Sequence, residues 1–294
     1  MKNNILYLMV AAMLLFVACD PIEERHDAGE VLTEAELMSY MDVTITGNVA
    51  TCTNTAPGVV SFWKTDFGQQ SNNNAVDFYI PLQNTYTATL TAYCAGGPVT
   101  VSKEFVIEQN DPEYFSDPFW NLLTNDVAGK SWVWATDIPG GKIWGNGGYL
   151  ASVKPEWWAL GVADILSQGG TATDEIIFDL NGGLNFQVIN SVDEGENTAV
   201  PGNGTGTFNM DLGEANHLMN SDGSAVWSYG KITFTNHTIP LGFEPNSSGK
   251  PLHYVFDILK LTEDELQLAF PEPGVNYAWG TAWFYMFKRK GYTY

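Results

Sequence analysis

Five of the ten tryptophans of the chain fall within one short stretch, residues 130–158. Glycine pairs and prolines separate them, which indicates loops and short strands. Each indole is large and carries an N–H group that needs a hydrogen-bond partner, so a β-sheet core does not easily absorb all five rings. Flat aromatic rings on glycine-rich loops suit the apolar faces of sugar rings. The stretch therefore predicts a carbohydrate-binding surface formed by some of Trp132, Trp134, Trp144, Trp157 and Trp158.

The spacing of these tryptophans indicates which of them can face a ligand. Trp132 and Trp134 lie two residues apart on a predicted strand, so they share one face, which is either core or ligand surface. Trp144 lies between glycine-rich turns and is expected to face the ligand. Trp157 and Trp158 are consecutive and point to opposite sides of an extended chain, so we expect one in the core and the other exposed.

Polar side chains must fix the sugar hydroxyls by hydrogen bonds, because aromatic rings hold only the apolar face. Four polar residues lie near the tryptophans in the sequence: Asp137, Lys142, Asn146 and Glu156. Trp279 and Trp283 are later candidates, of which Trp283 alternates with Tyr285 in a predicted strand and is expected in the core. The predicted ligand-binding residues are Trp134, Asp137, Trp144, Asn146, Glu156, Trp157 and Trp158.

No recognised catalytic motif accompanies this surface. A glycoside hydrolase needs two carboxylates flanking the scissile bond. The nearest arrangement, Asp174, Glu175 and Asp179, is more simply a solvent-facing strand edge. The sequence contains no Gly-x-Ser-x-Gly nucleophile motif, no phosphate-binding loop and no dinucleotide fingerprint. Binding without catalysis is therefore predicted, and a glycoside hydrolase or lyase of an unrecognised type is the alternative.

No cofactor and no metal site are predicted. The four histidines lie at no metal-ligand spacing from a cysteine. Loop carboxylates such as Asp137, Asp164 or Asp174 supply oxygen ligands suited to one structural Ca²⁺, but their spacing does not single out a site.

The formal net charge of −21 narrows the class of ligand. Binding of nucleic acid needs Lys and Arg against the phosphates, so nucleic acid is not an expected partner. Polyanionic ligands are disfavoured for the same reason. A neutral polysaccharide or oligosaccharide is the expected partner.

The N-terminus predicts export and a lipid anchor. Lys2 precedes an apolar run, residues 5–18, that is too short to span a bilayer but suits a signal peptide. Its end, Leu15-Phe-Val-Ala-Cys19, resembles a bacterial lipobox, which implies that residues 1–18 are removed and that Cys19 carries lipid. The acidic residues after Cys19 resemble the export signal of Bacteroidetes surface lipoproteins. The expected location is the cell envelope, anchored by lipid to the outer membrane and exposed at the surface.

Residues 19–42 form a predicted tether, in which a capping box at residues 33–36 indicates a short helix. Residues 43–110 then show short alternating strands, which predicts an immunoglobulin-like sandwich. The exported environment favours a disulfide between Cys52 and Cys94, and two buried free thiols are the alternative.

Two segments of this first domain, Phe62-Trp-Lys-Thr-Asp-Phe-Gly68 and Asn84-Thr-Tyr-Thr-Ala-Thr-Leu90, resemble the PKD domain. That family carries a Trp-Asp-Phe-Gly-Asp-Gly turn and a Gly-Thr-Tyr-Thr-Val-Thr-Leu strand. Here two residues separate Trp63 from Asp66, so the turn departs from the family pattern. The resemblance implies a spacer or a surface for a partner.

Asp-Pro pairs at residues 111–112 and 117–118 mark a linker, and Ser116 or Asp117 can cap a helix with Pro118 in its first turn. Residues 117–294 are again β-rich, with long loops. This pattern predicts a jelly-roll β-sandwich like that of carbohydrate-binding modules, and a lipocalin-like barrel is the alternative. The whole chain is thus predicted to be all-β. The strands expected in this domain are residues 131–135, 175–180, 184–189, 206–210, 226–229, 231–234, 254–259, 265–269 and 282–288.

The second domain also resembles a group of known proteins. Gly129-Lys-Ser-Trp-Val-Trp134, Gly145-Asn-Gly-Gly148, Trp157-Trp158 and Asp174-Glu-Ile-Ile-Phe178 follow one another as in certain Bacteroidetes cell-surface lipoproteins. Those proteins carry a PKD-like module ahead of a glycan-binding β-sandwich and occur with polysaccharide-uptake systems. The resemblance implies capture of a polysaccharide for an outer-membrane uptake complex. A structural or adhesin-like protein that binds another surface protein is the remaining alternative.

Overall fold

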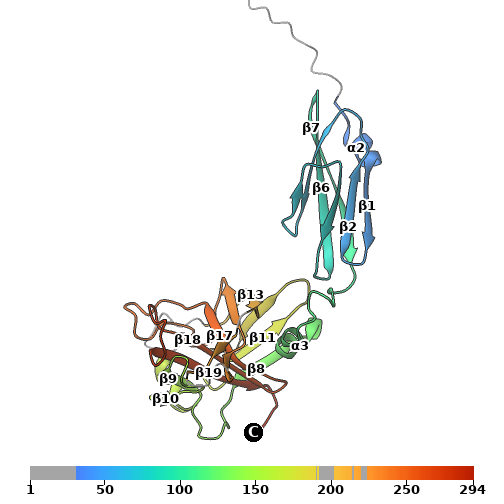
Figure 1. Cartoon of the computed structure of the whole chain (residues 1–294). Helices are drawn as coiled ribbons and strands as arrows, with labels where there is room; N and C mark the ends of the chain where they lie inside the picture. Colours follow the sequence, from blue (N-terminus) through green and yellow to red (C-terminus); the bar gives the residue numbers. More distant parts are fainter. Residues whose placement is uncertain (1–30, 190, 192–201, 214, 220–223) are drawn as a thin grey trace, which may run out of the picture. The chain divides into compact units, whose positions relative to one another are not determined.

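The computed structural model describes residues 31–189, 191, 202–213, 215–219 and 224–294 (Figure 1). The predicted signal peptide, Cys19 and the first part of the tether lie outside these residues. The chain divides into two compact units, a smaller one centred on residues 51–78 and 87–104 and a larger one that contains residues 105–294. Within the described part of the chain, no helix is long and apolar enough to cross a membrane.

The tether ends in the predicted short helix, α2 (Glu34–Tyr40). The Thr33 hydroxyl accepts a hydrogen bond from the Glu36 backbone N–H at 3.2 Å, and the Glu36 carboxylate accepts one from the Thr33 N–H at 2.8 Å. This reciprocal pair satisfies N–H groups that the first helical turn leaves without a partner. The capping box in the sequence therefore predicted the helix correctly.

Seven strands follow α2 and form two sheets, as expected for an immunoglobulin-like sandwich. Trp63 is fully buried and lies opposite Leu90 in the antiparallel pairing of β3 with β6. The all-β class is thus confirmed for this domain. One sheet contains β1 (Met41–Thr46), β2 (Val49–Asn54) and β5 (Ala75–Tyr79), and the other contains β4 (Gln70–Ser71), β3 (Val60–Thr65), β6 (Asn84–Cys94) and β7 (Gly97–Ile107).

The predicted disulfide of the sandwich is not formed, because Cys52 and Cys94 are both free thiols. Cys52 is fully buried on β2, whereas Cys94 ends β6 in the other sheet. The Cys94 thiol donates a hydrogen bond to the carbonyl oxygen of Gly97 at 2.8 Å, within its own hairpin. Burial, reinforced by the nearby charge of Asp77, raises the pKa of Cys52 to about 11. Both cysteines are therefore free, as in the alternative, but only Cys52 is fully buried.

The linker leads into helix α3 (Pro118–Thr124), as the sequence predicted. The Asp117 carboxylate accepts a hydrogen bond from the Phe119 N–H at 2.9 Å, and the helix ends at Asn125 in the left-handed conformation. Trp120 and Leu123 are buried in the core of the larger domain. Two short 3-10 turns follow, η1 (Asp126–Ala128) and, later in the chain, η2 (Ile165–Gln168).

Eight strands of the larger domain pair antiparallel in the order of the sequence. The last strand then pairs with the first, because Phe287 lies opposite Trp134 and Arg289 opposite Trp132. This closure makes the sheet an up-and-down barrel, the alternative to the jelly roll, since a jelly roll needs strand crossovers that are absent from this order. The barrel strands are β8 (Lys130–Trp134), β11 (Glu175–Asp179), β12 (Asn185–Ile189), β13 (Gly204–Asp211), β16 (Lys231–Thr235), β17 (Val255–Leu261), β18 (Glu265–Pro271) and β19 (Thr281–Arg289).

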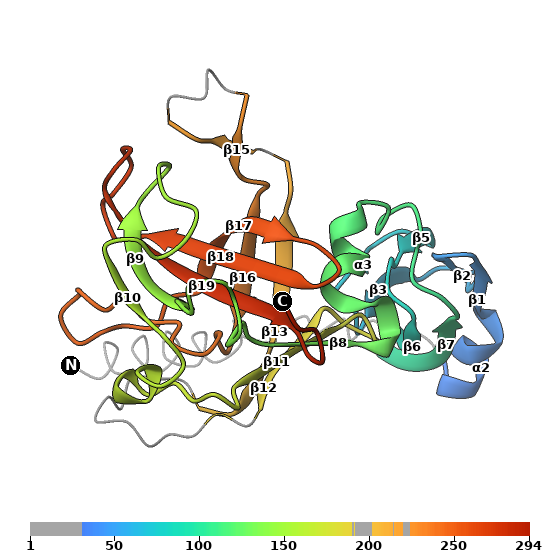
Figure 2. The same ribbon diagram turned by 90° about the horizontal axis from the view of Figure 1, so that it is seen from below.

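Two further strands extend the sheet beyond the closed part of the barrel. The first half of β19, residues 281–285, pairs with β9 (Trp144–Gly148), and β9 pairs with β10 (Trp158–Leu160). Figure 2 shows β9 and β10 beside this half of β19. The long β19 thus has two partners on one edge, β8 for the barrel and β9 for the extension.

A small hairpin covers part of the outer face of the barrel. It consists of β14 (Asn216–His217) and β15 (Val226–Ser228). Trp227 is fully buried there and its Nε1–H donates to the carbonyl oxygen of Ser152 at 2.7 Å. Trp227 packs with four apolar residues of the outer face, Leu259, Ala269, Ala282 and Phe284.

A buried carboxyl group, Asp257 on β17, lies under this hairpin and is 2% exposed. Burial raises its pKa to about 6, against the opposing effects of Lys231 and of hydrogen bonds from Ser228 at 3.2 Å and Asn216 at 3.4 Å. Tyr149 also faces this charge. Since the folded protein holds the proton more tightly than the unfolded chain, the stability that this group contributes is complete below its unfolded pKa of about 4. That contribution is lost as the pH rises through about 6.

The variant Asp257→Asn is therefore expected to be more stable than the wild type at pH 8, by on the order of 2 kcal/mol. At pH 4 the two proteins should have similar stability, because the wild-type carboxyl group is then neutral. Urea unfolding at pH 4, 6 and 8 measures this difference. Glu108→Gln removes a charge from an exposed position and is the control. A variant that is less stable than the wild type at pH 8 would contradict the prediction.

Candidate functional site

Three of the five tryptophans of residues 130–158 are core residues: Trp132, Trp134 and Trp144 are fully buried. Trp134 stacks on Phe287 with ring centroids 4.4 Å apart, and its Nε1–H donates to the Asp174 carboxylate at 2.8 Å. The prediction that Trp134 and Trp144 face a ligand is therefore wrong. Both side chains belong to the core of the larger domain, and their strands pair with β19, far away in the sequence.

Trp144 was expected at the surface because glycines flank it. Its ring instead stacks on Trp283, with centroids 5.1 Å apart, and lies 5.9 Å from Phe243 and 6.4 Å from Tyr285. Trp283 is itself buried, as the sequence predicted. The flanking glycines serve strand pairing: a Cβ atom at Gly145 would lie 2.1 Å from the carbonyl oxygen of Trp158 on β10.

Trp157 and Trp158 are both exposed, by 50% and 42%, so the expectation that one is buried is wrong. The expectation assumed an extended chain, but Trp157 lies in a bend immediately before β10. The backbone folds around Asn146, whose carbonyl oxygen accepts hydrogen bonds from the N–H groups of Glu156 and Trp157, each at 3.0 Å. The Asn146 side-chain oxygen accepts a third, from the Trp158 N–H at 3.0 Å.

A third exposed indole, Trp279, comes from the loop that joins β18 to β19 and is 53% exposed. Its backbone N–H donates to the Tyr149 carbonyl oxygen at 2.9 Å, and the Tyr149 N–H donates to Gly280 at 2.7 Å. These bonds hold the loop against the end of β9. Tyr277, on the same loop, is 61% exposed.

These three indoles converge on β9, and we call Trp157, Trp158 and Trp279 the aromatic platform. A Cβ atom at Gly148 would lie 2.9 Å from Trp279 Cε3 and 3.4 Å from Trp157 Cζ2, so both rings contact this glycine. Trp158 meets two buried rings edge-on, Trp144 at 5.6 Å and Trp283 at 5.9 Å. The core residues Trp144 and Trp283 thus support Trp158. Gly148, which has no side chain, leaves space for Trp157 and Trp279.

The predicted polar residues fall into two groups. Asn146 and Glu156 belong to the platform: Ser152 Oγ donates to the Glu156 carboxylate at 2.7 Å and accepts from the Gly148 N–H at 3.0 Å. Asp137 does not belong to it, because its carboxylate pairs with Lys288 and accepts the Tyr294 N–H at 3.2 Å. The bond from Lys288 is the main cause that lowers the Asp137 pKa.

Lys142 is exposed in the loop before β9. Asp137 is paired elsewhere, and Asn146 binds the backbone of residues 156–158, so Glu156 is the predicted polar residue best placed to meet a ligand on the platform.

Acrylamide quenching is expected to divide the tryptophan fluorescence into an accessible fraction from the platform and a protected fraction from the other seven indoles, all of which are buried. Replacing Trp157, Trp158 and Trp279 together with alanine should remove the accessible fraction. A quenching curve that this triple variant leaves unchanged would show that the exposed indoles are elsewhere.

The carboxylates considered for catalysis have structural partners. Glu175 is buried and pairs with Lys290 at 2.7 Å. Asp174 is 1% exposed, and burial raises its pKa despite the hydrogen bonds from Thr171 and Trp134. Asp179 accepts the Asn181 N–H at 2.9 Å. Among the described residues, no group of three or more His, Cys, Asp or Glu side chains is placed to hold a metal ion.

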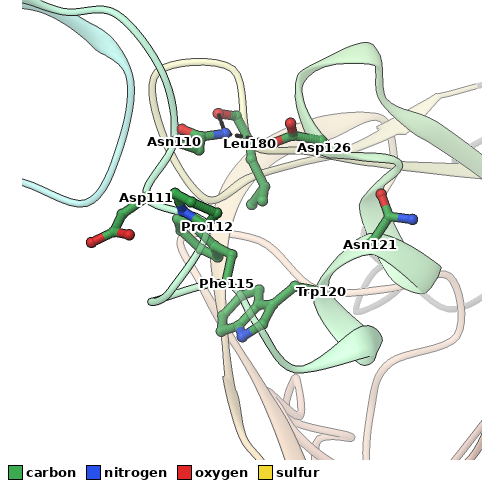
Figure 3. A pocket seen from close by; sticks show the side chains of 8 residues that line it. All are labelled: Asn110, Asp111, Pro112, Phe115, Trp120, Asn121, Asp126 and Leu180. Atoms are coloured by element: carbon green, nitrogen blue, oxygen red, sulfur yellow. Dashed lines mark hydrogen bonds between the residues drawn. The ribbon is translucent and has the colours of Figure 1, made fainter. Parts of the chain in front are cut away.

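A cavity of about 210 Å³ lies at the start of the larger domain, away from the platform residues (Figure 3). Phe115 and Trp120 line it with ring centroids 5.2 Å apart. Its polar groups bind one another: the Asn110 amide donates to Asp126 at 2.6 Å and to the Leu180 carbonyl oxygen at 3.2 Å. These hydrogen bonds connect the linker to η1 and to the residue that follows β11, so we regard the cavity as structural.

No protein family matches the sequence, and no curated protein matches it. The chain is similar to the PKD1 domain of Vibrio anguillarum Epp, with 20% identity, covering 24% of this chain and 89% of that one, at a TM-score of 0.22. It is also similar to the PKD1 domain of the Vibrio cholerae metalloprotease PrtV, with 20% identity, covering 24% and 93% of the two chains, at a TM-score of 0.22.

Proposed function

We propose that this protein binds a neutral polysaccharide or oligosaccharide on the aromatic platform. The observation that carries the proposal is that the three exposed indoles, of ten in the chain, come from two segments far apart in the sequence, residues 157–158 and the β18–β19 loop, and gather beside β9. Exposed contiguous apolar surface on a folded domain usually marks a binding site. Indole faces bind the apolar faces of sugars, and Glu156 and the neighbouring loops supply hydrogen-bonding groups.

The charge of the chain supports a neutral ligand. A net charge of −21 repels acidic polymers, and the cations near the C-terminus of β19 already have partners. Lys288 pairs with Asp137, Arg289 with Asp264 and Lys290 with Glu175. Because each of these three cations has a carboxylate partner, none of them is free to attract an anionic ligand at that end of the strand.

The N-terminal sequence also supports a proposal for where the protein is located in the cell. A lipidated Cys19 would anchor the protein to a membrane through its lipid chains without crossing it. We place the protein on the outer membrane, at the cell surface, where it captures the glycan and passes it to an uptake complex. The sandwich would then act as a spacer between anchor and platform.

Titration of the intrinsic fluorescence with a panel of neutral polysaccharides, β-glucans first, tests the binding proposal. At least one polysaccharide is expected to change the emission and to protect the accessible indoles from acrylamide. The Trp157→Ala/Trp158→Ala/Trp279→Ala variant should lose that response, whereas Tyr93→Ala, a half-exposed aromatic change in the sandwich, should keep it. Absence of any response across the panel would refute the proposal.

A protein partner is the second candidate, because exposed tryptophans are also frequent hot spots of protein interfaces. The two candidates differ in the requirement for sugar. Capture of an uptake-complex component by the wild type without glycan, and its loss in the triple tryptophan variant, would favour the protein partner. Release of reducing ends from a bound polysaccharide would instead indicate the enzyme alternative.

A further inference from the structure

We infer that the platform binds an internal segment of a linear glycan, at least two sugar residues long, rather than a single sugar or a chain end. The inference rests on the proposed function and specifies its ligand. It comes from how the three indoles are distributed along β9 and from how much of each ring is open.

The indoles mark two separate places on β9. Trp158 lies opposite Asn146, the middle residue of the strand, whereas Trp157 and Trp279 lie against Gly148, the last residue. Two residue steps separate these positions, which is about 7 Å at ~3.3 Å per residue of a strand. That separation is longer than one sugar ring, so a single sugar reaches only one of the two places.

The platform is also open. Each of its rings keeps between 42% and 53% of its surface exposed, so one face is available and no ring is enclosed. Pockets for small ligands, in contrast, bury about 70–90% of the ligand surface. A site that covers only one side of its ligand gains affinity by contacting several units in a row, and it leaves both ends of the chain free to continue.

The two places should contribute differently. Trp158 is fixed edge-on by Trp144 and Trp283, which belong to the core, so its orientation is set before the ligand arrives. Trp279 is held by its loop, through the bond to Tyr149, and leans on a glycine. We therefore expect Trp158 to bind short and long ligands, and Trp279 to matter mainly for ligands that reach the far end of β9.

A length series of oligosaccharides, from monosaccharide upward, prepared from the polysaccharide that binds best in the titration, tests this inference by calorimetry. Affinity should rise by about tenfold to a hundredfold with length and then level off once the ligand spans both places. Trp279→Ala should abolish most of this rise, and it should weaken the binding of the shortest ligand much less than that of the longest. Reduction of the reducing end to an alditol should leave the affinity of long ligands unchanged.

The outcomes separate the inference from the proposed function. A monosaccharide that binds as tightly as the long oligosaccharide, or a loss of binding after the reducing end is modified, would overturn the inference while glycan binding stands. No binding of any polysaccharide would overturn both. An equal loss from Trp279→Ala at every ligand length would show one compact site and would also contradict the inference.

Discussion

Replacing Trp144 with alanine is expected to lower the free energy of unfolding of the barrel domain by about 3–5 kcal/mol. The side chain is fully buried and contacts Trp283, Phe243 and Tyr285, with ring centroids between 5.1 and 6.4 Å away. Alanine would leave a cavity as large as an indole among these rings. A core this aromatic cannot collapse to fill it, because rigid rings do not change shape.

Urea unfolding of the full chain, followed by tryptophan fluorescence, measures this loss. Trp63 is the only tryptophan of the sandwich, so the signal reports mainly on the barrel. Trp157→Ala is the matched control: the same substitution at a half-exposed position should change the stability by no more than about 0.5–1 kcal/mol. If Trp144→Ala kept its stability and lost only glycan binding, Trp144 would be a ligand-binding residue, as its glycine-rich neighbours suggested.

The contrast between Trp144 and Trp158 shows what the sequence could and could not predict. All nine strands expected in the second domain have a counterpart, because apolar alternation is local. The strand β9 was missed, since Trp-Gly-Asn-Gly-Gly has no alternation of apolar and polar residues. Its strand character comes from pairing with β10 and with β19, of which β19 lies more than a hundred residues later in the chain.

Long-range strand pairing also determines which tryptophans are buried. Trp132 and Trp134 are buried because β19 closes the barrel against β8, a contact between opposite ends of the domain. No local pattern distinguishes that closure from a sandwich with two open edges, which is why the sequence left the barrel as the alternative. Helix caps, in contrast, depend on three or four consecutive residues, and both predicted helices were confirmed.

The positions of the exposed indoles could not be predicted from the sequence for a similar reason. Trp157 and Trp158 would alternate only in an extended chain, and three hydrogen bonds to Asn146 bend the chain at this point. Asn146 was predicted to bind sugar, but its carbonyl and side-chain oxygens hold the loop that presents the tryptophans. Trp279 joins them from the β18–β19 loop, about 120 residues away in the sequence. Only the pairing of β9 with β19 brings this loop beside Gly148.

Replacing Trp158 with alanine is expected to weaken the binding of a polysaccharide identified in the titration by about tenfold to a hundredfold, or roughly 1.4–2.7 kcal/mol. Trp158 is the one platform ring held by core side chains, so it loses little conformational entropy on binding. Hot spots of binding surfaces are commonly tryptophans supported in this way. The stability should fall by only about 1 kcal/mol, because the ring is 42% exposed.

Binding and unfolding measured on the same preparations separate this effect from a folding defect. Trp158→Phe retains an aromatic face and should recover part of the affinity, whereas Trp158→Leu retains apolar volume without a flat ring and should not. Trp158→Ala and Trp144→Ala are then opposites: the first loses affinity at nearly unchanged stability, and the second loses stability first. If Trp158→Leu bound as well as the wild type, apolar contact alone would explain the site, and stacking on a sugar face would no longer be needed to account for the exposed indole.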